Sequence, residues 1–223
     1  MIPYWMSRTQ LMLGDENMTS LMSKNVLVIG LGGVGAICAE MIVRAGVGKI
    51  TIVDNDRVDA SNINRQIQAL HSTVDMPKAK VLAARLLDIN PNLELTVHEM
   101  YIKEEITTNL LSSASWDYVV DCIDTLSCKV FLIKKCLDMK LPIVSSMGAG
   151  GKLDPTQVKV VVGDATVPIR TRRRTRDVVH GVQPERDRAA RQDAGLQVVL
   201  TQVHLLRAVI AQVQRQRLSR VGE

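Results

Sequence analysis

The sequence predicts an α/β fold with a Rossmann-like, doubly wound and mostly parallel sheet. Short apolar segments alternate with longer amphipathic ones over residues 25–146, which is the pattern of strands joined by helices. A glycine-rich segment, Gly30–Gly35, follows the first apolar segment and opens the next helix. The second strand then ends in an acidic residue, Asp54. These features together predict the opening unit of a nucleotide-binding sheet.

The elements are expected in alternation along the chain. Residues Pro3–Ser23 predict a short helix and a connector, with a break at Gly14–Asn17, and a polar loop with a short helix is expected over Asp56–His71. Strands are expected at Asn25–Ile29, Lys49–Asp54, Glu94–His98, Tyr118–Cys122 and Ile143–Ser146. Helices are expected at Ala36–Ala45, Lys78–Ile89, Glu104–Ser112 and Ser127–Met139. The second of these ends at Asn90-Pro91, because the residue before a proline avoids the helical conformation.

The composition changes abruptly near Val160. All eleven lysines lie at or before Lys159, whereas the last 63 residues contain twelve arginines and no lysine. We therefore predict a main domain over residues 1–160 and a divergent, Arg-rich tail over residues 161–223. The tail is expected to be either disordered, as the charged Thr171–Arg176 segment indicates, or helical where apolar residues recur over Leu196–Val213. Either the tail is a lineage-specific arm that pairs Arg172–Arg174 with nucleic-acid phosphates, or it is a frameshifted or chimeric end.

The composition also favours a soluble cytoplasmic protein. No apolar stretch reaches the length of a membrane span, and the N-terminus lacks the pattern of a signal peptide. The net charge of +5 suits a polyanionic partner such as nucleic acid. The four cysteines form no C-x-x-C pair, which argues against a zinc site and for a reducing compartment. Cys122 and Cys128 are candidate nucleophiles, although a buried structural role is favoured for both.

The glycine-rich segment predicts a phosphate-binding turn. Its glycines, Gly30, Gly32, Gly33 and Gly35, permit a tight turn and close approach of backbone amides, and the following helix N-terminus adds partial positive charge. This fingerprint alone would also fit an NAD enzyme. However, residues Ser61–Gln66 and then Lys78 supply amide, guanidinium and ammonium groups behind the turn. Such a set suits a triphosphate better than a nicotinamide.

Carboxylates for Mg²⁺ are expected from Asp121 and Asp124, which follow a strand and should meet the glycine turn at one edge of the sheet. A helix N-cap is the alternative role for Asp124. Asp54 is placed to hold a ribose hydroxyl, and a turn or capping residue is the alternative there.

These ordered motifs resemble the ThiF/MoeB/HesA family, which has the ubiquitin-activating-enzyme-like fold. The resemblance covers Arg8 to Lys159 and rests on G-x-G-G-x-G, the acid pair Asp54 and Asp56, S-N-x-x-R-Q, Lys78 and D-x-x-D. It implies an enzyme that binds ATP and Mg²⁺ and attaches AMP to a carboxylate. The implied nucleotide site comprises the four glycines with Asp54, Asp56, Ser61, Asn62, Arg65, Gln66, Lys78, Asp124 and Thr125.

The resemblance also implies roles for individual residues. Gly33 contacts the nucleotide, Asp54 holds the ribose, and Asn62, Arg65 and Lys78 reach the phosphates. Asp124 binds Mg²⁺, Thr125 lines the pocket, and Arg8 is donated across a homodimer interface. Arg65, Lys78 and Mg²⁺ at Asp124 would neutralise charge as pyrophosphate departs. A plain surface arginine is the alternative for Arg8.

Two further segments point to one branch of the family. Gly148–Thr156, and Asn64–Ile67 followed by Ala69-Leu70, resemble the branch that cyclises threonylcarbamoyladenosine in tRNA by an ATP-dependent dehydration. A flexible loop is the alternative for Gly148–Gly151. The implied partners are tRNA bearing this nucleoside and a second copy of the chain.

Other functions stay open from the sequence. One is adenylation of the C-terminal glycine of a sulfur-carrier protein, with the carrier or a cysteine desulfurase as partner, although those branches usually carry paired C-x-x-C motifs. The others are a non-catalytic nucleotide-binding relative and, more distantly, an NAD oxidoreductase.

Overall fold

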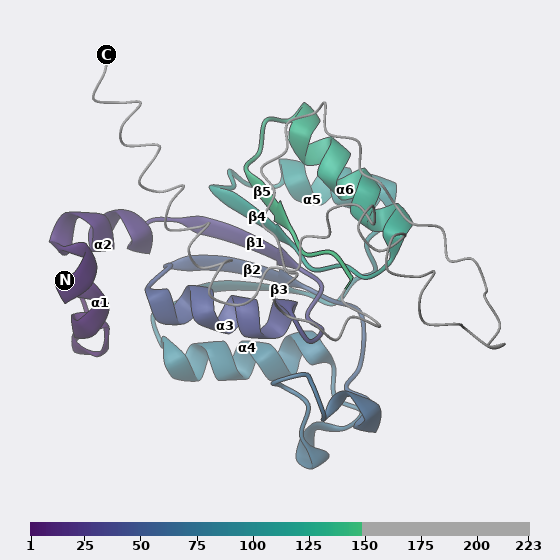
Figure 1. Ribbon diagram of the computed structural model, residues 1–223, viewed down its shortest axis with the longest axis horizontal. Helices are drawn as coiled ribbons and strands as arrows, with labels where there is room; N and C mark the ends of the chain where they lie inside the picture. Colours follow the sequence, from purple (N-terminus) through teal and green to yellow (C-terminus); the bar gives the residue numbers. More distant parts are fainter. Residues whose placement is uncertain (149–223) are drawn as a thin grey trace, which may run out of the picture.

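A five-stranded parallel sheet forms the centre of the protein (Figure 1). The computed structural model describes residues 1–148 of the chain. The strands are β1 (Asn25–Ile29), β2 (Lys49–Val53), β3 (Glu94–His98), β4 (Tyr118–Asp121) and β5 (Ile143–Ser145), in the spatial order β3-β2-β1-β4-β5. The chain runs outward from β1 to β3 and then returns to the other side of β1, which is the doubly wound arrangement. The predicted fold class is confirmed, and the predicted tail lies outside the described residues.

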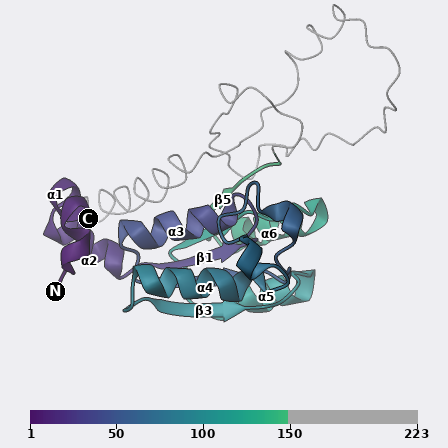
Figure 2. The same cartoon turned by 90° about the horizontal axis from the view of Figure 1, so that it is seen from below.

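Two helices cover each face of the sheet. Helices α3 (Gly35–Ala45) and α4 (Lys78–Ile89) pack on one face, and α5 (Glu104–Ser112) and α6 (Leu126–Asp138) pack on the other (Figures 1 and 2). Residues of β1 alternate between the two cores: Val26 and Val28 join the first, and Leu27 and Ile29 join the second. Because both faces are buried, the strand is apolar from Val26 to Ile29 and shows no polar alternation there.

The N-terminal segment differs from the prediction. It forms a 3₁₀ turn (Tyr4–Met6), α1 (Ser7–Leu13) and α2 (Asp15–Met22), so the expected connector is a second helix. Gly14, with a φ of 76°, separates the two helices, and Asp15 and Glu16 lie in the first turn of α2, where negative charge is favourable.

The helix pair α1–α2 lies at the amino end of the sheet (Figure 1). Met18 of α2 and Met6 of the preceding 3₁₀ turn are buried, and both pack where a side chain at Gly46 would lie. Gly46 ends α3 in a left-handed conformation with a φ of 110°, as a C-terminal glycine commonly does. The other predicted elements agree with the structure to within one residue at each end. The predicted polar loop contains one short 3₁₀ helix, Ala60–Asn62, and a second one, His71–Thr73, begins at its last residue.

Candidate functional site

The glycine turn lies where β1 ends, directly against the segment that follows β4. Gly30 has a φ of 88°, and a Cβ there would lie 2.7 Å from the Cys122 carbonyl oxygen. A Cβ on Gly35 would overlap the Gly30 carbonyl. Only glycine fits these two positions, because a side chain would collide with backbone. The fold therefore brings the glycine turn and the D-x-x-D segment together, as predicted.

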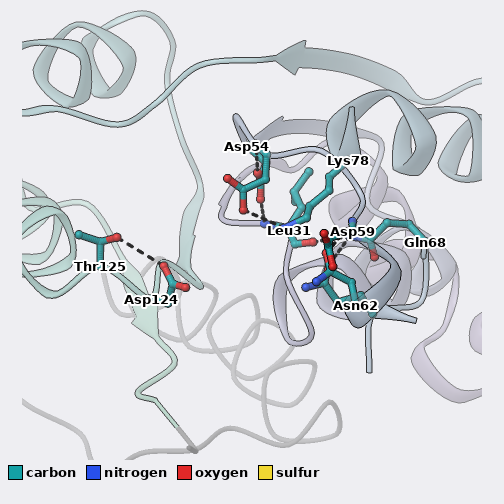
Figure 3. A network of polar contacts seen from close by, with 10 residues as sticks. Leu31, Asp54, Asp59, Asn62, Gln68, Lys78, Asp124 and Thr125 are labelled. Carbon is teal, nitrogen blue, oxygen red and sulfur yellow. Dashed lines mark hydrogen bonds and ion pairs between the residues drawn. The ribbon is translucent and has the colours of Figure 1, made fainter. Parts of the chain in front are cut away.

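Asp54 anchors the glycine turn to the end of β2. Its Oδ2 accepts a hydrogen bond from the Leu31 N–H at 2.6 Å, and its Oδ1 accepts one from the Asp56 N–H at 2.7 Å (Figure 3). Burial raises the pKa of the Asp54 carboxyl above its usual range, although these two bonds and the nearby Lys78 act in the opposite direction. The alternative role of Asp54 as a turn residue is therefore confirmed, and a contact with ribose stays a prediction.

Two backbone amides of the turn are open to a ligand. Among the described residues, neither the Gly32 N–H nor the Gly33 N–H has a protein acceptor. Gly33 is exposed and Gly32 is partly exposed, and helix α3 begins two residues later. Free amides at the start of a helix attract anionic groups such as phosphates.

Lys78 begins α4 and is tied to Asp56. Its Nζ lies 2.8 Å from Asp56 Oδ2, and its N–H donates to the Asp56 carbonyl oxygen at 2.9 Å (Figure 3). The Lys78 side chain is 7% exposed, whereas that of Asp56 is 58% exposed. Asp56 thus holds the lysine in place from the solvent side of the loop.

Arg65 packs against the glycine turn. A Cβ on Gly33 would lie 3.2 Å from the Arg65 carbonyl oxygen and 3.6 Å from its Cγ. One guanidinium nitrogen, Nη1, donates to the Ser61 carbonyl oxygen at 2.9 Å and to Asn64 Oδ1 at 3.1 Å. The other guanidinium N–H groups have no acceptor within residues 1–148, so this exposed cation can still bind an anion.

Asn62 and Gln66 have structural roles beneath Arg65. Asn62 is buried and closes a capping box with Asp59, its Oδ1 accepting the Asp59 N–H at 3.2 Å (Figure 3). Gln66 is also buried, and its Oε1 accepts a hydrogen bond from Gln68. Both side chains therefore stabilise the loop that carries Arg65 at the edge of the sheet.

The two acids of the D-x-x-D segment lie in different environments. Asp124 is exposed, and its Oδ1 lies 3.4 Å from the Thr125 hydroxyl oxygen (Figure 3). Helix α6 begins at Leu126 with Thr125 as its N-cap residue and no side-chain capping bond, so the capping alternative for Asp124 is wrong. Asp121 is fully buried and paired with Lys129 at 2.6 Å. The expectation that both acids supply ligands is therefore wrong for Asp121.

Asp124 suits Mg²⁺ as a single protein ligand. No group of three or more metal-ligating side chains occurs within residues 1–148. Mg²⁺ in phosphate-binding sites is commonly held by one or two carboxylates, with phosphate oxygens and waters as the other ligands. The exposed Asp124 carboxylate, two residues after the Cys122 carbonyl that faces Gly30, fits that requirement.

Arg8 is not brought to this edge within one chain. It is an exposed residue of α1, at the amino end of the sheet, whereas the glycine turn lies at the carboxyl end (Figure 1).

The motifs missed three residues that the structure places beside the site. Gln68 contacts Leu31, Lys129 pairs with Asp121, and the Tyr101 hydroxyl lies 3.7 Å from Cys128 Sγ. No local sequence pattern marks these residues, because each contact joins residues that are 8 to 37 positions apart in the chain.

The cysteines beside the site, Cys122 and Cys128, are only partly buried, and burial raises the pKa of the Cys122 thiol well above its usual range.

Open amides, two cations and an exposed acid at the carboxyl edge of a doubly wound sheet define a Rossmann-like nucleotide-binding protein. Within that class, the sequence profile of the ThiF family matches residues 6–216. The chain therefore belongs to the ThiF family. The match continues beyond Lys159, where the motif resemblance was expected to end.

Two curated relatives from different bacteria carry the same name. The tRNA threonylcarbamoyladenosine dehydratase of Bacillus subtilis (strain 168) is 42% identical over 183 residues, covering 79% of this chain and 72% of the relative. The enzyme of the same name from Escherichia coli (strain K12) is 38% identical over 152 residues, covering 68% of this chain and 56% of the relative. The chain thus spans little more than half the length of the second relative.

Solved structures give the same result. The crystal structure of the E. coli dehydratase, TcdA, has a TM-score of 0.66 and 37% identity, covering 69% of this chain and 64% of that one. A second structure of that protein, in complex with ATP, matches with the same TM-score and identity and is covered to 63%.

None of the helices within residues 1–148 is both long and apolar enough to cross a membrane.

Proposed function

We propose that this chain is an ATP-dependent tRNA threonylcarbamoyladenosine dehydratase, which cyclises that nucleoside through an adenylated carboxylate. The observation that carries this proposal is the pair of open amides at Gly32 and Gly33, set against Arg65 and beside the segment of Asp124. Relatives that are 42% and 38% identical carry this activity in their names, and the E. coli protein has been solved with ATP and with AMP.

The reaction requires activation of a carboxylate. A carboxylate is a poor electrophile, and ATP supplies AMP to it while pyrophosphate leaves. Attack on the activated carbonyl carbon from within the same modification then closes a ring, and AMP departs with the carboxylate oxygen. The nucleoside loses one water in total, and ATP becomes AMP and pyrophosphate.

The residues of the chain supply positioning and charge. The amides of Gly32 and Gly33 and the start of α3 bind phosphate oxygens. Arg65 and Lys78 neutralise the negative charge that develops on the departing pyrophosphate. The contact with Asp56 keeps the Lys78 ammonium group at the edge of the sheet, where it can neutralise this charge. Asp54 holds the ribose, and Asp124 holds Mg²⁺ with Thr125 beside it.

The functional unit in this proposal is a homodimer. Arg8 lies at the amino end of the sheet, away from the site of its own chain (Figure 1). It therefore reaches a nucleotide only from a second copy, as the family resemblance implies. We propose that this enzyme acts on its tRNA substrate in the cytoplasm.

The direct test is incubation of the full chain with ATP, Mg²⁺ and tRNA bearing threonylcarbamoyladenosine, followed by mass analysis of the nucleosides. We expect a product lighter by one water, formed only when ATP is present. Unchanged nucleoside together with measurable ATP binding would refute the dehydratase activity and favour a non-catalytic nucleotide-binding relative.

A second candidate is adenylation of a sulfur-carrier protein. The sulfur carrier protein ThiS adenylyltransferase of E. coli (strain K12) is 33% identical over 149 residues, covering 65% of this chain and 59% of the relative. ATP–pyrophosphate exchange separates the two candidates. Stimulation by the modified tRNA supports the dehydratase, and stimulation by a carrier protein with a C-terminal glycine supports the alternative.

A further inference from the structure

Gln68 has a buried side-chain amide with both of its hydrogens committed. Its Nε2 donates to the Leu31 carbonyl oxygen at 2.5 Å and to Gln66 Oε1 at 3.3 Å (Figure 3). The opposite orientation of the amide would set its oxygen against these two acceptors, so the chemistry assigns the nitrogen to this side. Gln68 Oε1 is then the only buried side-chain polar atom within residues 1–148 that has no hydrogen-bond partner.

The bond from Gln68 holds the Leu31 carbonyl group, and Asp54 holds the Leu31 N–H. The Leu31 N–H donates to Asp54 Oδ2, and the Leu31 carbonyl accepts from Gln68 Nε2 (Figure 3). In a planar trans peptide, the carbonyl of one residue and the N–H of the next point in opposite directions. The Gly32 N–H must therefore point away from Gln68, and it has no acceptor among the described residues.

The glycines on either side of Leu31 do little to fix the orientation of the Leu31–Gly32 peptide. Leu31 lies between Gly30 and Gly32, and glycine adopts many backbone conformations with little steric restraint. Without an external restraint, the Leu31–Gly32 peptide can rotate and turn its N–H away from a ligand. Gln68 provides that restraint, and its own carbonyl oxygen is fixed by the Thr73 hydroxyl at 2.9 Å.

The unpartnered oxygen argues that Gln68 serves orientation more than stability. Burying a polar atom without a partner is unfavourable, whereas an apolar side chain of similar shape avoids that cost. The hydrogen bond that its amide N–H donates to the Leu31 carbonyl oxygen therefore explains why a glutamine occupies this position.

We infer that Gln68 is a positioning residue for nucleotide binding: its amide orients the Leu31–Gly32 peptide so that the Gly32 N–H faces the phosphates. This inference rests on the proposed function, because it assumes that the turn binds a nucleotide.

The test compares ATP binding by Gln68→Met and wild-type full-length chains, using calorimetry with Mg²⁺. We expect the Met variant to bind ATP about fivefold more weakly, the effect of one neutral hydrogen bond. Its melting temperature should fall modestly, because the Leu31 carbonyl oxygen and Gln66 Oε1 lose their donor while the unpartnered Gln68 oxygen is removed. Gln68→His, which keeps an N–H donor, should restore most of the affinity.

A matched control is Thr107→Val on α5, which removes a buried bond from Thr107 Oγ1 to the Lys103 carbonyl oxygen at 2.8 Å. This variant should lose stability without losing ATP affinity. Wild-type affinity in Gln68→Met would overturn the inference. So would a His variant as weak as the Met variant, or a loss of ATP affinity in Thr107→Val as large as that in Gln68→Met. Absence of ATP binding by the wild-type chain would instead refute the proposed function.

Discussion

Lys129 Nζ lies 2.6 Å from Asp121 Oδ2, and this ion pair is almost completely shielded from solvent. Asp121 also accepts hydrogen bonds from the Ser145 hydroxyl at 2.5 Å and from the Ile123 N–H at 3.0 Å. Lys129 donates in addition to the Ser146 carbonyl oxygen at 2.9 Å. One ion pair thus joins β4, α6 and the end of β5, and it restrains the backbone one residue before Asp124.

Removal of one partner from this pair should destabilise the fold. Lys129→Met leaves the Asp121 carboxylate buried without its cation, and we expect a loss of about 3–5 kcal/mol in the free energy of unfolding. The double variant Asp121→Asn with Lys129→Met is neutral, so it should recover most of that loss. Urea unfolding followed by circular dichroism measures both. A single variant as stable as the wild type would show that the pair is unimportant for folding.

Substitutions in the proposed site should separate activity from stability. We expect Lys78→Ala and Asp124→Ala each to abolish ATP–pyrophosphate exchange and leave the fold intact. Asp124 is exposed, and an exposed substitution typically changes stability by no more than about 0.5 kcal/mol. Lys80→Ala is a suitable control, because Lys80 lies on the same helix as Lys78 and forms an exposed ion pair with Glu99 at 2.9 Å. Full exchange activity in either site variant would count heavily against the site.

Most of the fold could be predicted because its signals are local. The sequence of β3, Glu94–His98, and that of α4, Lys78–Ile89, show their periods directly, and both sets of bounds agree with the structure. The second helix of the N-terminal pair could not be predicted. Its sequence begins with a Gly-Asp-Glu-Asn segment that is typical of a turn, and packing of Met18 near Gly46 stabilises it as a helix.

The candidate site could be predicted only where it depends on ordered motifs. The glycine turn and Arg65 are in contact as expected. The residue pattern offered both Asp121 and Asp124 as ligands, and only the family resemblance singled out Asp124. The physical difference between them arises from Lys129 on the following helix. It also could not identify Gln68, whose role depends on a contact with a residue 37 positions away.

The cysteines should differ in reactivity towards alkylating reagents. Burial raises the pKa values of Cys38 and Cys136 to about 12, and the thiolate is the reactive form. At pH 8 we expect iodoacetamide to modify the partly exposed Cys128 first and these two last. ATP should slow the modification of Cys128, since Thr125 of the proposed pocket precedes it by three residues. Peptide mass spectrometry with and without ATP measures each rate, and rapid alkylation of Cys38 in the folded protein would contradict the structure.

Glu40 should make part of the stability dependent on pH. Its carboxylate is buried between α3 and α4, where it accepts hydrogen bonds from Arg44 Nε at 2.8 Å and from Arg85 Nη2 at 3.2 Å. Burial alone would raise the pKa of Glu40, but these two arginines outweigh burial and hold the pKa below its ordinary value of 4.5. The contribution of Glu40 is therefore complete above about pH 4.5 and is lost as the pH falls through the lowered pKa.

The variant Glu40→Gln tests this dependence. At pH 7 we expect it to lose about 1–3 kcal/mol, the usual cost of breaking a buried, charge-assisted hydrogen bond. Its melting temperature should approach that of the wild type as the pH falls below 4.5, because protonation removes the same charge from the wild-type protein. Glu99→Gln is the control, since an exposed pair contributes little at any pH. A constant difference between wild type and Glu40→Gln from pH 7 to pH 3 would show that the Glu40 carboxylate does not stabilise the fold through its charge.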